Sequence, residues 1–241
     1  MIDQEPCWPR VSSSRLRLAE QLESWGPGVW DRPSLCADWT VRDVVAHLVA
    51  TATVPTPAAA WAYLRAGCDV DRSSQALGAA VLAGRSDAEV LDLLRSSAGS
   101  RAHPPGLRAE GVLAELVVHT ADITVAIGAP SATPEGDLQL TLAYLARRVP
   151  GNTRFNLTRR GRVPVLDGAH RVDGLRLRAT DVQWEHGAPG APLVEGPAVS
   201  LVVAVAGRER ALDDLDGPGV EGLRRGGAVG AEGLEPPTSS L

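Results

Sequence analysis

Apolar residues recur at the spacing of an α-helix in four stretches of the first half of the chain. They predict helices over residues 12–25, 40–52, 87–100 and 110–127. The second helix begins at Thr40, which forms a capping-box pattern with Asp43, and Gly128 is typical of the residue that follows a helix. Four such helices predict a bundle whose apolar stripes share one core.

Shorter patterns cover the rest of the chain. Helical character resumes over 58–66 and 75–82, and a further helix begins at Thr133 or Pro134. Short β-like runs follow at 163–166 and 174–180, with 181–184 continuing or closing the second run; then come a buried helix over 199–206 and helical turns at 211–215 and 219–225. We therefore expect an α+β multidomain chain, with a four-helix bundle over 10–150, a small α+β domain over 151–226 and a disordered tail over 227–241.

Composition narrows the classes of function. The chain has 241 residues, 44% of them hydrophobic, which is enough for a substantial core. Its formal net charge is -5, which does not indicate a surface that binds nucleic acid. All 24 basic residues are arginine, which excludes a Schiff-base lysine and the lysine of a P-loop. The run of arginines within 147–162 indicates either a solvated seam between domains or a site for an anionic ligand.

Cysteine spacing and hydropathy indicate a cytoplasmic protein. Cys7, Cys36 and Cys68 have no C-x-x-C spacing, which favours reduced thiols over disulfides or a thiolate zinc site. The first residues lack the pattern of a signal peptide, and the longest apolar run, 198–206, is too short to cross a bilayer.

The predicted helix over 110–127 carries polar groups where a buried helix should be apolar. Glu115 and His119 are four residues apart, so their side chains lie one turn apart on the same face, and Asp122 extends that column. A carboxylate and an imidazole placed in this way can bind a divalent metal. The alternative is an ordinary Glu–His contact on a solvated edge, and Asp122 is either a group that orients a ligand or a polar residue at the edge of the bundle.

A third candidate ligand lies on the apolar stripe of the second helix. His47 follows Val44 by one turn, and its alternative role is that of a hydrogen-bonded core histidine. With Glu115 and His119 it would form a set of two histidines and one carboxylate from two helices. Three protein ligands leave one coordination position open, as in catalytic zinc sites.

Two stretches of the first half resemble a known family. CADWTVRDVVAHLVA (Cys36–Ala50) and AELVVHTADITVAIG (Ala114–Gly128) resemble the mycothiol-dependent maleylpyruvate isomerase family, which is part of the wider DinB-like metal-binding bundles. The resemblance implies metal-ligand roles for His47, Glu115 and His119. The stretches 174–187 and 195–220 are similar to the small α+β domain attached to such bundles, and by position there Arg208 is the candidate catalytic arginine.

The resemblance also implies a chemistry. It implies a divalent metal, with zinc as the first choice, and the thiol cofactor mycothiol, whose metal-favoured thiolate would act on a small unsaturated or electrophilic acid. Cis–trans isomerisation and thiol transfer both remain open, as does a non-catalytic metal-binding or regulatory module. We expect the reactive thiol to come from the cofactor and not from the chain's own cysteines, with Cys36 as the credible exception. The expected partners are a small-molecule substrate and a low-molecular-weight thiol, without nucleic acid or membrane, for a monomer or homodimer.

Overall fold

A computed structural model describes residues 7–103, 107–147 and 171–226. Within these ranges, seven α-helices and one short 3₁₀ helix form the first part of the chain, as α1 Cys7–Trp25, η1 Pro27–Val29, α2 Val41–Thr53, α3 Thr56–Arg65, α4 Val70–Leu82, α5 Asp87–Ser96, α6 Ala109–Ile127 and α7 Glu135–Ala146. Four of them, α1, α2, α5 and α6, correspond to the four helices predicted from the apolar spacing. The predicted fold class, a helical bundle followed by a small α+β part, is confirmed.

Local sequence sets the ends of these helices. Thr40 accepts a hydrogen bond from the backbone N–H of Asp43, whose carboxylate accepts one from the backbone N–H of Thr40 in return. Ser86 and Glu89 form the same reciprocal pair of hydrogen bonds, a capping box, at the start of α5. Gly128 ends α6 in the left-handed region at φ 70°, which glycine adopts without steric strain.

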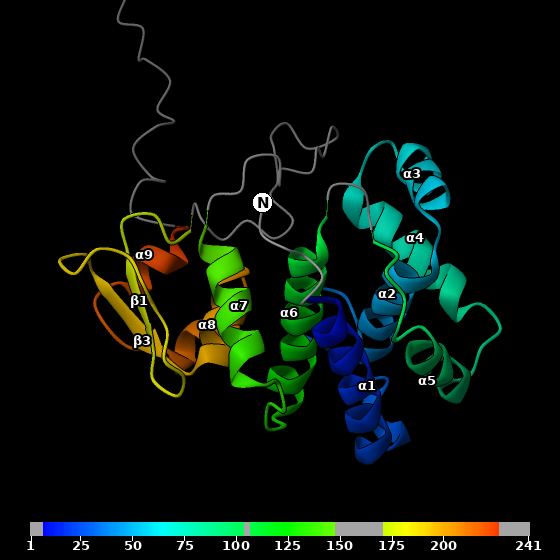
Figure 1. Ribbon diagram of the computed structural model, residues 1–241, viewed down its shortest axis with the longest axis horizontal. Coiled ribbons are helices and arrows are strands. Elements are labelled where there is room, and N and C mark those ends of the chain that lie inside the picture. Colours follow the sequence, from blue (N-terminus) through cyan, green and yellow to red (C-terminus); the bar gives the residue numbers. More distant parts are fainter. Residues whose placement is uncertain (1–6, 104–106, 148–170, 227–241) are drawn as a thin grey trace, which may run out of the picture.

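Helix α6 contributes residues to two apolar cores. Figure 1 shows α6 between α1 on one side and α7 on the other, and it also packs against α2 and α8. Leu116 and Ile123 face the core formed with α1, α2 and α5, whereas Leu113 and Val117 face the core formed with α7, α8 and the sheet. A helix with partners on both sides is apolar nearly all round, which is why the polar residues of α6 are unusual.

One glycine makes the close packing of α6 against α7 possible. A Cβ atom on Gly111 would lie 2.7 Å from the hydroxyl oxygen of Tyr144 and 3.0 Å from the nearest side-chain carbon of Leu107. A larger residue at this position would require the side chains of Tyr144 and Leu107 to shift.

The second part of the chain is a three-stranded sheet covered by helices. The strands are β1 Arg176–Ala179, β2 Glu185–His186 and β3 Leu193–Gly196, in the order β2-β1-β3; β1 pairs antiparallel with β2 and parallel with β3. Helix α8 Ala198–Val205 follows β3, with η2 Glu209–Asp214 and α9 Val220–Arg224 after it. The strands are buried on one side by α8, which also packs against α7.

Several details differ from the sequence predictions. Residues 181–184 close the first strand, and β2 and β3 were missed because runs of two and four residues carry too little alternation to detect. Helix α4 begins at Val70, five residues before the predicted start, since Asp69 caps it. The predicted strand 163–166 and the tail 227–241 lie outside the described residues, and the domain boundaries stay a prediction.

No helix among the described residues is long and apolar enough to span a membrane.

Arg15 anchors α1 to the end of α5. Its side chain is fully buried, and Nη1 donates to the carbonyl oxygens of Ser97, Ala98 and Ser100 at 3.1, 3.3 and 2.7 Å. Burial lowers the pKa of Arg15 to about 10, so the guanidinium keeps its charge at neutral pH. These carbonyl groups follow the end of α5 at Ser96, four residues before the predicted end, and accept from a side chain where a longer helix would have supplied backbone donors.

We predict that Arg15→Leu lowers the free energy of unfolding by about 3 kcal/mol, because it leaves buried carbonyl groups without a donor. Urea unfolding followed by circular dichroism measures the change. The half-buried Arg17 on the same helix provides the control, and Arg17→Leu should change stability by no more than about 0.5 kcal/mol. Equal effects of the two substitutions would contradict this role for Arg15.

Candidate metal centre

His47, Glu115 and His119 come together between α2 and α6. One donor atom from each residue lies within 4.8 Å of the other two. Nε2 of His47 is 3.2 Å from Oε1 of Glu115, and the two imidazole rings meet edge to face with 5.0 Å between their centroids. The structure therefore brings together all three candidate ligands that the sequence predicts, on α2, which begins at the capping box of Thr40, and on α6, which ends at Gly128.

Burial makes this cluster suitable for a cation. His47 and Glu115 are buried, and His119 retains a small exposed fraction. A carboxylate next to two imidazoles in a largely dry environment supplies the nitrogen and oxygen donors that zinc and related divalent ions prefer. With three protein donors, the donor set fits an ion that keeps at least one position for water or another ligand.

Asp122 holds His119 in one orientation. Asp122 is fully buried, and its Oδ2 accepts a hydrogen bond of 3.0 Å from Nδ1 of His119. Because Nδ1 faces this carboxylate, the other ring nitrogen, Nε2, is the one left to act as a metal donor. This carboxylate–histidine pairing fixes both the tautomer and the direction of the ring.

Arg208 reaches the same carboxylate from the second part of the chain. Its Nε and Nη2 donate to Oδ1 and Oδ2 of Asp122, each at 2.8 Å, and its Nη1 donates to the carbonyl of Ala206. The bidentate pair ties the turn after α8 to α6. Arg208, the candidate catalytic arginine predicted from the sequence, therefore lies beside the candidate metal cluster and is linked through Asp122 to one of its candidate ligands, His119.

These contacts shift the pKa values of the groups around Asp122. Burial raises the pKa of the Asp122 carboxyl, but hydrogen bonds from Arg208 and His119 outweigh it and hold that pKa well below the ordinary value. Burial lowers the pKa of His119, and its contacts with Asp122 and Cys36 reverse this and raise the pKa from 6.5 to about 10. Without a metal, His119 is therefore protonated at neutral pH and must lose one proton to become a ligand.

Cys36 lies closer to the site than helical spacing indicated. Its Sγ donates to Oδ2 of Asp122 at 3.0 Å and is 3.5 Å from Nδ1 of His119, while Nη2 of Arg208 donates to the sulfur at 3.5 Å. The loop before α2 folds against α6, where the N–H of Leu35 donates to the carbonyl of Asp122. Helical periodicity gave no signal for this, because Cys36 belongs to a loop.

Cys36, His119 and Asp122 form a second group of potential metal donors. Both oxygens of Asp122 are already paired with the guanidinium of Arg208, and a cation placed there would meet that positive charge. In the first cluster the carboxylate of Glu115 is instead hydrogen-bonded to His47, a group that can itself become a neutral ligand of the same ion. We therefore assign the candidate metal position to the cluster of His47, Glu115 and His119.

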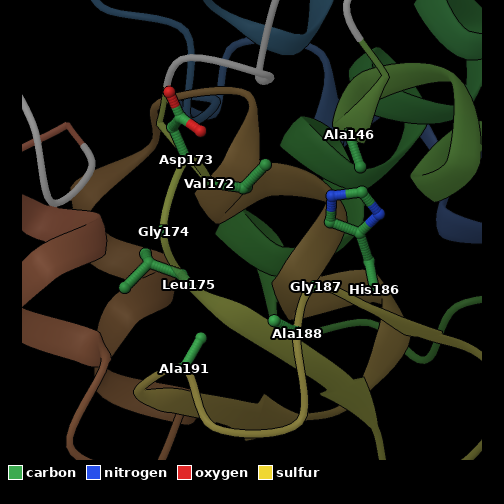
Figure 2. Close-up of a pocket in the computed structure, with 9 residues that line it drawn as sticks. All are labelled: Ala146, Val172, Asp173, Gly174, Leu175, His186, Gly187, Ala188 and Ala191. Carbon is green, nitrogen blue, oxygen red and sulfur yellow. The ribbon is translucent and has the colours of Figure 1, made fainter.

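A separate cavity of about 300 Å³ lies between the end of α7, the segment that leads into β1, and the end of β2 with the loop that follows it. Figure 2 shows its lining, which is mostly backbone and small side chains together with Asp173 and His186. None of the predicted site residues lines this cavity, so it is not part of the candidate metal centre.

Comparison with known proteins agrees with the resemblance found in the sequence. Residues 11–105 match the family model of the mycothiol maleylpyruvate isomerase N-terminal domain, a stretch that contains His47 and ends before Glu115. No curated protein matches the chain.

Two solved structures are similar to this chain. One is mycothiol-dependent maleylpyruvate isomerase, at 18% identity and a TM-score of 0.53, covering 90% of this chain and 93% of that one. A mutant of mycothiol-dependent maleylpyruvate isomerase gives 17% identity and a TM-score of 0.48, covering 88% and 90%. The first of these likenesses shows a shared fold along both parts of the chain.

We predict that Asp122→Asn lowers zinc affinity roughly 10- to 100-fold, because the ring of His119 loses the carboxylate that orients it. Competition with a chromophoric chelator measures the affinity. Asp137→Asn is the matched control, since Asp137 is also a buried carboxylate paired with an arginine, Arg10, but lies on α7 away from the ligands. Loss of affinity in both variants, or in neither, would contradict the orienting role.

We also predict a pH dependence of stability in the metal-free protein. Because the pKa of His119 is raised on folding, its contribution to stability is complete below pH 6.5 and is lost as the pH rises toward about 10. The melting temperature of the metal-free protein should therefore fall over this range, and the fall should be smaller in His119→Gln. An identical pH profile for the two proteins would be evidence against a raised pKa.

Proposed function

We propose that this chain is a metal- and mycothiol-dependent enzyme of the maleylpyruvate isomerase family, a proposal supported by the match of residues 11–105 to the N-terminal domain model of that family. We propose further that its substrate is a small unsaturated or electrophilic acid. The observation that carries the proposal is the convergence of His47, Glu115 and His119, with Arg208 of the second part of the chain beside them through Asp122. A site built from both parts of the chain favours an enzyme over a metal-binding module confined to the bundle.

In this proposal His47, Glu115 and His119 hold a divalent metal, with zinc the best fit to two imidazoles and one carboxylate. When bound, the metal would favour the thiolate form of an incoming small thiol at neutral pH. Glu115 supplies the negative charge that partly balances the ion, and both histidines contribute neutral donors. His119 is protonated when no metal is present, and it would release one proton when the metal binds. The net charge of the centre depends on this release.

Asp122 controls where the remaining proton of His119 resides. It keeps a proton on Nδ1, so that Nε2 stays available to the metal throughout turnover. Since Arg208 holds the pKa of Asp122 well below its ordinary value, Asp122 stays ionised and does not take that proton. His119 is therefore a ligand in this scheme and not a general base.

In this proposal Arg208 is the group that meets an anionic substrate. Its Nε and Nη2 donate to Asp122, Nη2 also donates to the sulfur of Cys36, and Nη1 donates to the carbonyl of Ala206, while the side chain is still 24% exposed. A guanidinium has five N–H donors, so the exposed part can donate to a carboxylate without releasing Asp122. We propose that Arg208 holds the carboxylate of the substrate and stabilises negative charge that develops near it.

Two reactions fit such a site. In cis–trans isomerisation, addition of a thiol sulfur to the double bond leaves a single bond that can rotate, and departure of the same sulfur restores the double bond. In thiol transfer the sulfur displaces a leaving group, which departs with the electron pair of the broken bond, and the sulfur stays on the substrate. Both require the charge of the acid to be held in place while the carbon–sulfur bond forms, which is the role proposed for Arg208.

We predict that the purified protein binds one equivalent of zinc and that adding a small thiol then releases protons. Metal analysis and a thiol titration in weakly buffered solution measure both quantities. His47→Ala should lose the metal and with it the thiol-dependent proton release. Metal binding without any response to thiol, and without thiol-dependent turnover of maleylpyruvate, would favour a non-catalytic module instead.

We predict that Cys36→Ser retains thiol-dependent turnover, because in this proposal the reactive sulfur belongs to the cofactor. Serine keeps a donor for Oδ2 of Asp122, so the contacts around Arg208 should persist. A variant with all three cysteines replaced should behave in the same way. If either protein keeps its metal and fold but loses turnover, the nucleophile is internal and this mechanism is wrong.

A further inference from the structure

Trp39 lies against both histidines of the candidate metal centre. The centroid of its ring is 5.3 Å from that of His47, at an angle of 58°, and 6.4 Å from that of His119, at 20°. The other two tryptophan–histidine ring contacts in the described parts of the chain involve His103 and His186, which are not among the ligands. Trp39 is half-buried, and its apolar surface packs on the core formed by α1, α2 and α5.

The backbone fixes this tryptophan independently of its ring. The N–H of Trp39 donates to the carbonyl of Cys36 at 3.1 Å, and its own carbonyl accepts from the N–H and the hydroxyl of Ser34 at 3.0 and 2.9 Å. Asp38 turns the chain at φ 64°, a conformation that asparagine and aspartate tolerate better than most residues. The turn is hydrogen-bonded to α6 by the N–H of Leu35, which donates to the carbonyl of Asp122. A change of the side chain at position 39 therefore leaves these backbone hydrogen bonds in place.

One polar contact of each histidine bears on how its ring is oriented when a metal binds. His119 has Asp122 behind Nδ1, and this contact persists when Nε2 binds a metal. The hydrogen bond between Nε2 of His47 and Oε1 of Glu115 joins two atoms that would both become ligands. An aromatic surface against the His47 ring supplies an orienting contact that does not compete with the metal.

We propose that Trp39 is a positioning residue of the metal centre. Its indole holds the ring of His47 in the direction needed for coordination and shields one side of the two imidazoles from water. Both effects strengthen metal binding, because a fixed ligand loses less freedom and a drier environment strengthens the attraction between ion and donors. The inference rests on the proposed function in that it takes these histidines to be metal ligands.

The test compares Trp39→Leu, which removes the ring, with Trp39→Phe, which keeps an aromatic surface. Trp61→Leu is the control, because Trp61 is 61% exposed on α3. Zinc affinity is measured by chelator competition, and the geometry of the site by the visible absorption spectrum of the cobalt-substituted protein. Circular dichroism of the metal-free proteins establishes that each variant is folded.

We expect Trp39→Leu to lose roughly 10- to 100-fold in zinc affinity and to alter the cobalt spectrum, and Trp39→Phe to recover most of both. Trp61→Leu should match the unsubstituted protein. If Trp39→Leu does not fold, Trp39→Met replaces it, with the same expectation, because methionine fills the space without a ring.

Unchanged affinity and an unchanged spectrum in the non-aromatic variant would overturn the role of Trp39 and leave the metal-centre assignment standing. Failure of the unsubstituted protein to bind zinc or cobalt would overturn both.

Discussion

The buried carboxylate of Asp122 is the point on which the geometry of the site depends. It accepts from the imidazole of His119, from two nitrogens of Arg208 and from the thiol of Cys36, so three separate segments of the chain meet at one side chain. A fully buried carboxylate is stable only when its charge is balanced and its oxygens are hydrogen-bonded. Here part of the balancing charge comes from Arg208 in the second part of the chain, so in our proposal that part helps to orient the candidate ligand His119 on α6.

In our proposal, this dependence gives the α+β part a role in the chemistry. The sheet and α8 pack against α7 and α6 through a continuous apolar core, and the turn that follows α8 carries Arg208 to the site. The rigid packing determines where the guanidinium lies, and the bidentate pair with Asp122 determines its orientation. The centre is thus assembled from α2, α6, the loop before α2 and the turn after α8.

Those parts of the site that follow helical periodicity could be predicted from the sequence. His47, Glu115 and His119 lie on apolar stripes of two helices with clear end signals, so the residue spacing alone indicates which faces they occupy. Cys36 and Trp39 lie on an irregular loop whose path is set by hydrogen bonds to α6, and no spacing rule predicts such contacts. Arg208 was located through the family resemblance alone, and β2 and β3 were missed because their length is set by pairing partners on other strands.

The central claim is that His47, Glu115 and His119 share one metal ion, and anomalous diffraction at the zinc edge from crystals of the zinc-loaded protein tests it most directly. We expect a single peak about 2.0–2.2 Å from a donor atom of each of these residues. A peak bound instead by Cys36, His119 and Asp122, with Arg208 displaced from its carboxylate, would contradict this claim.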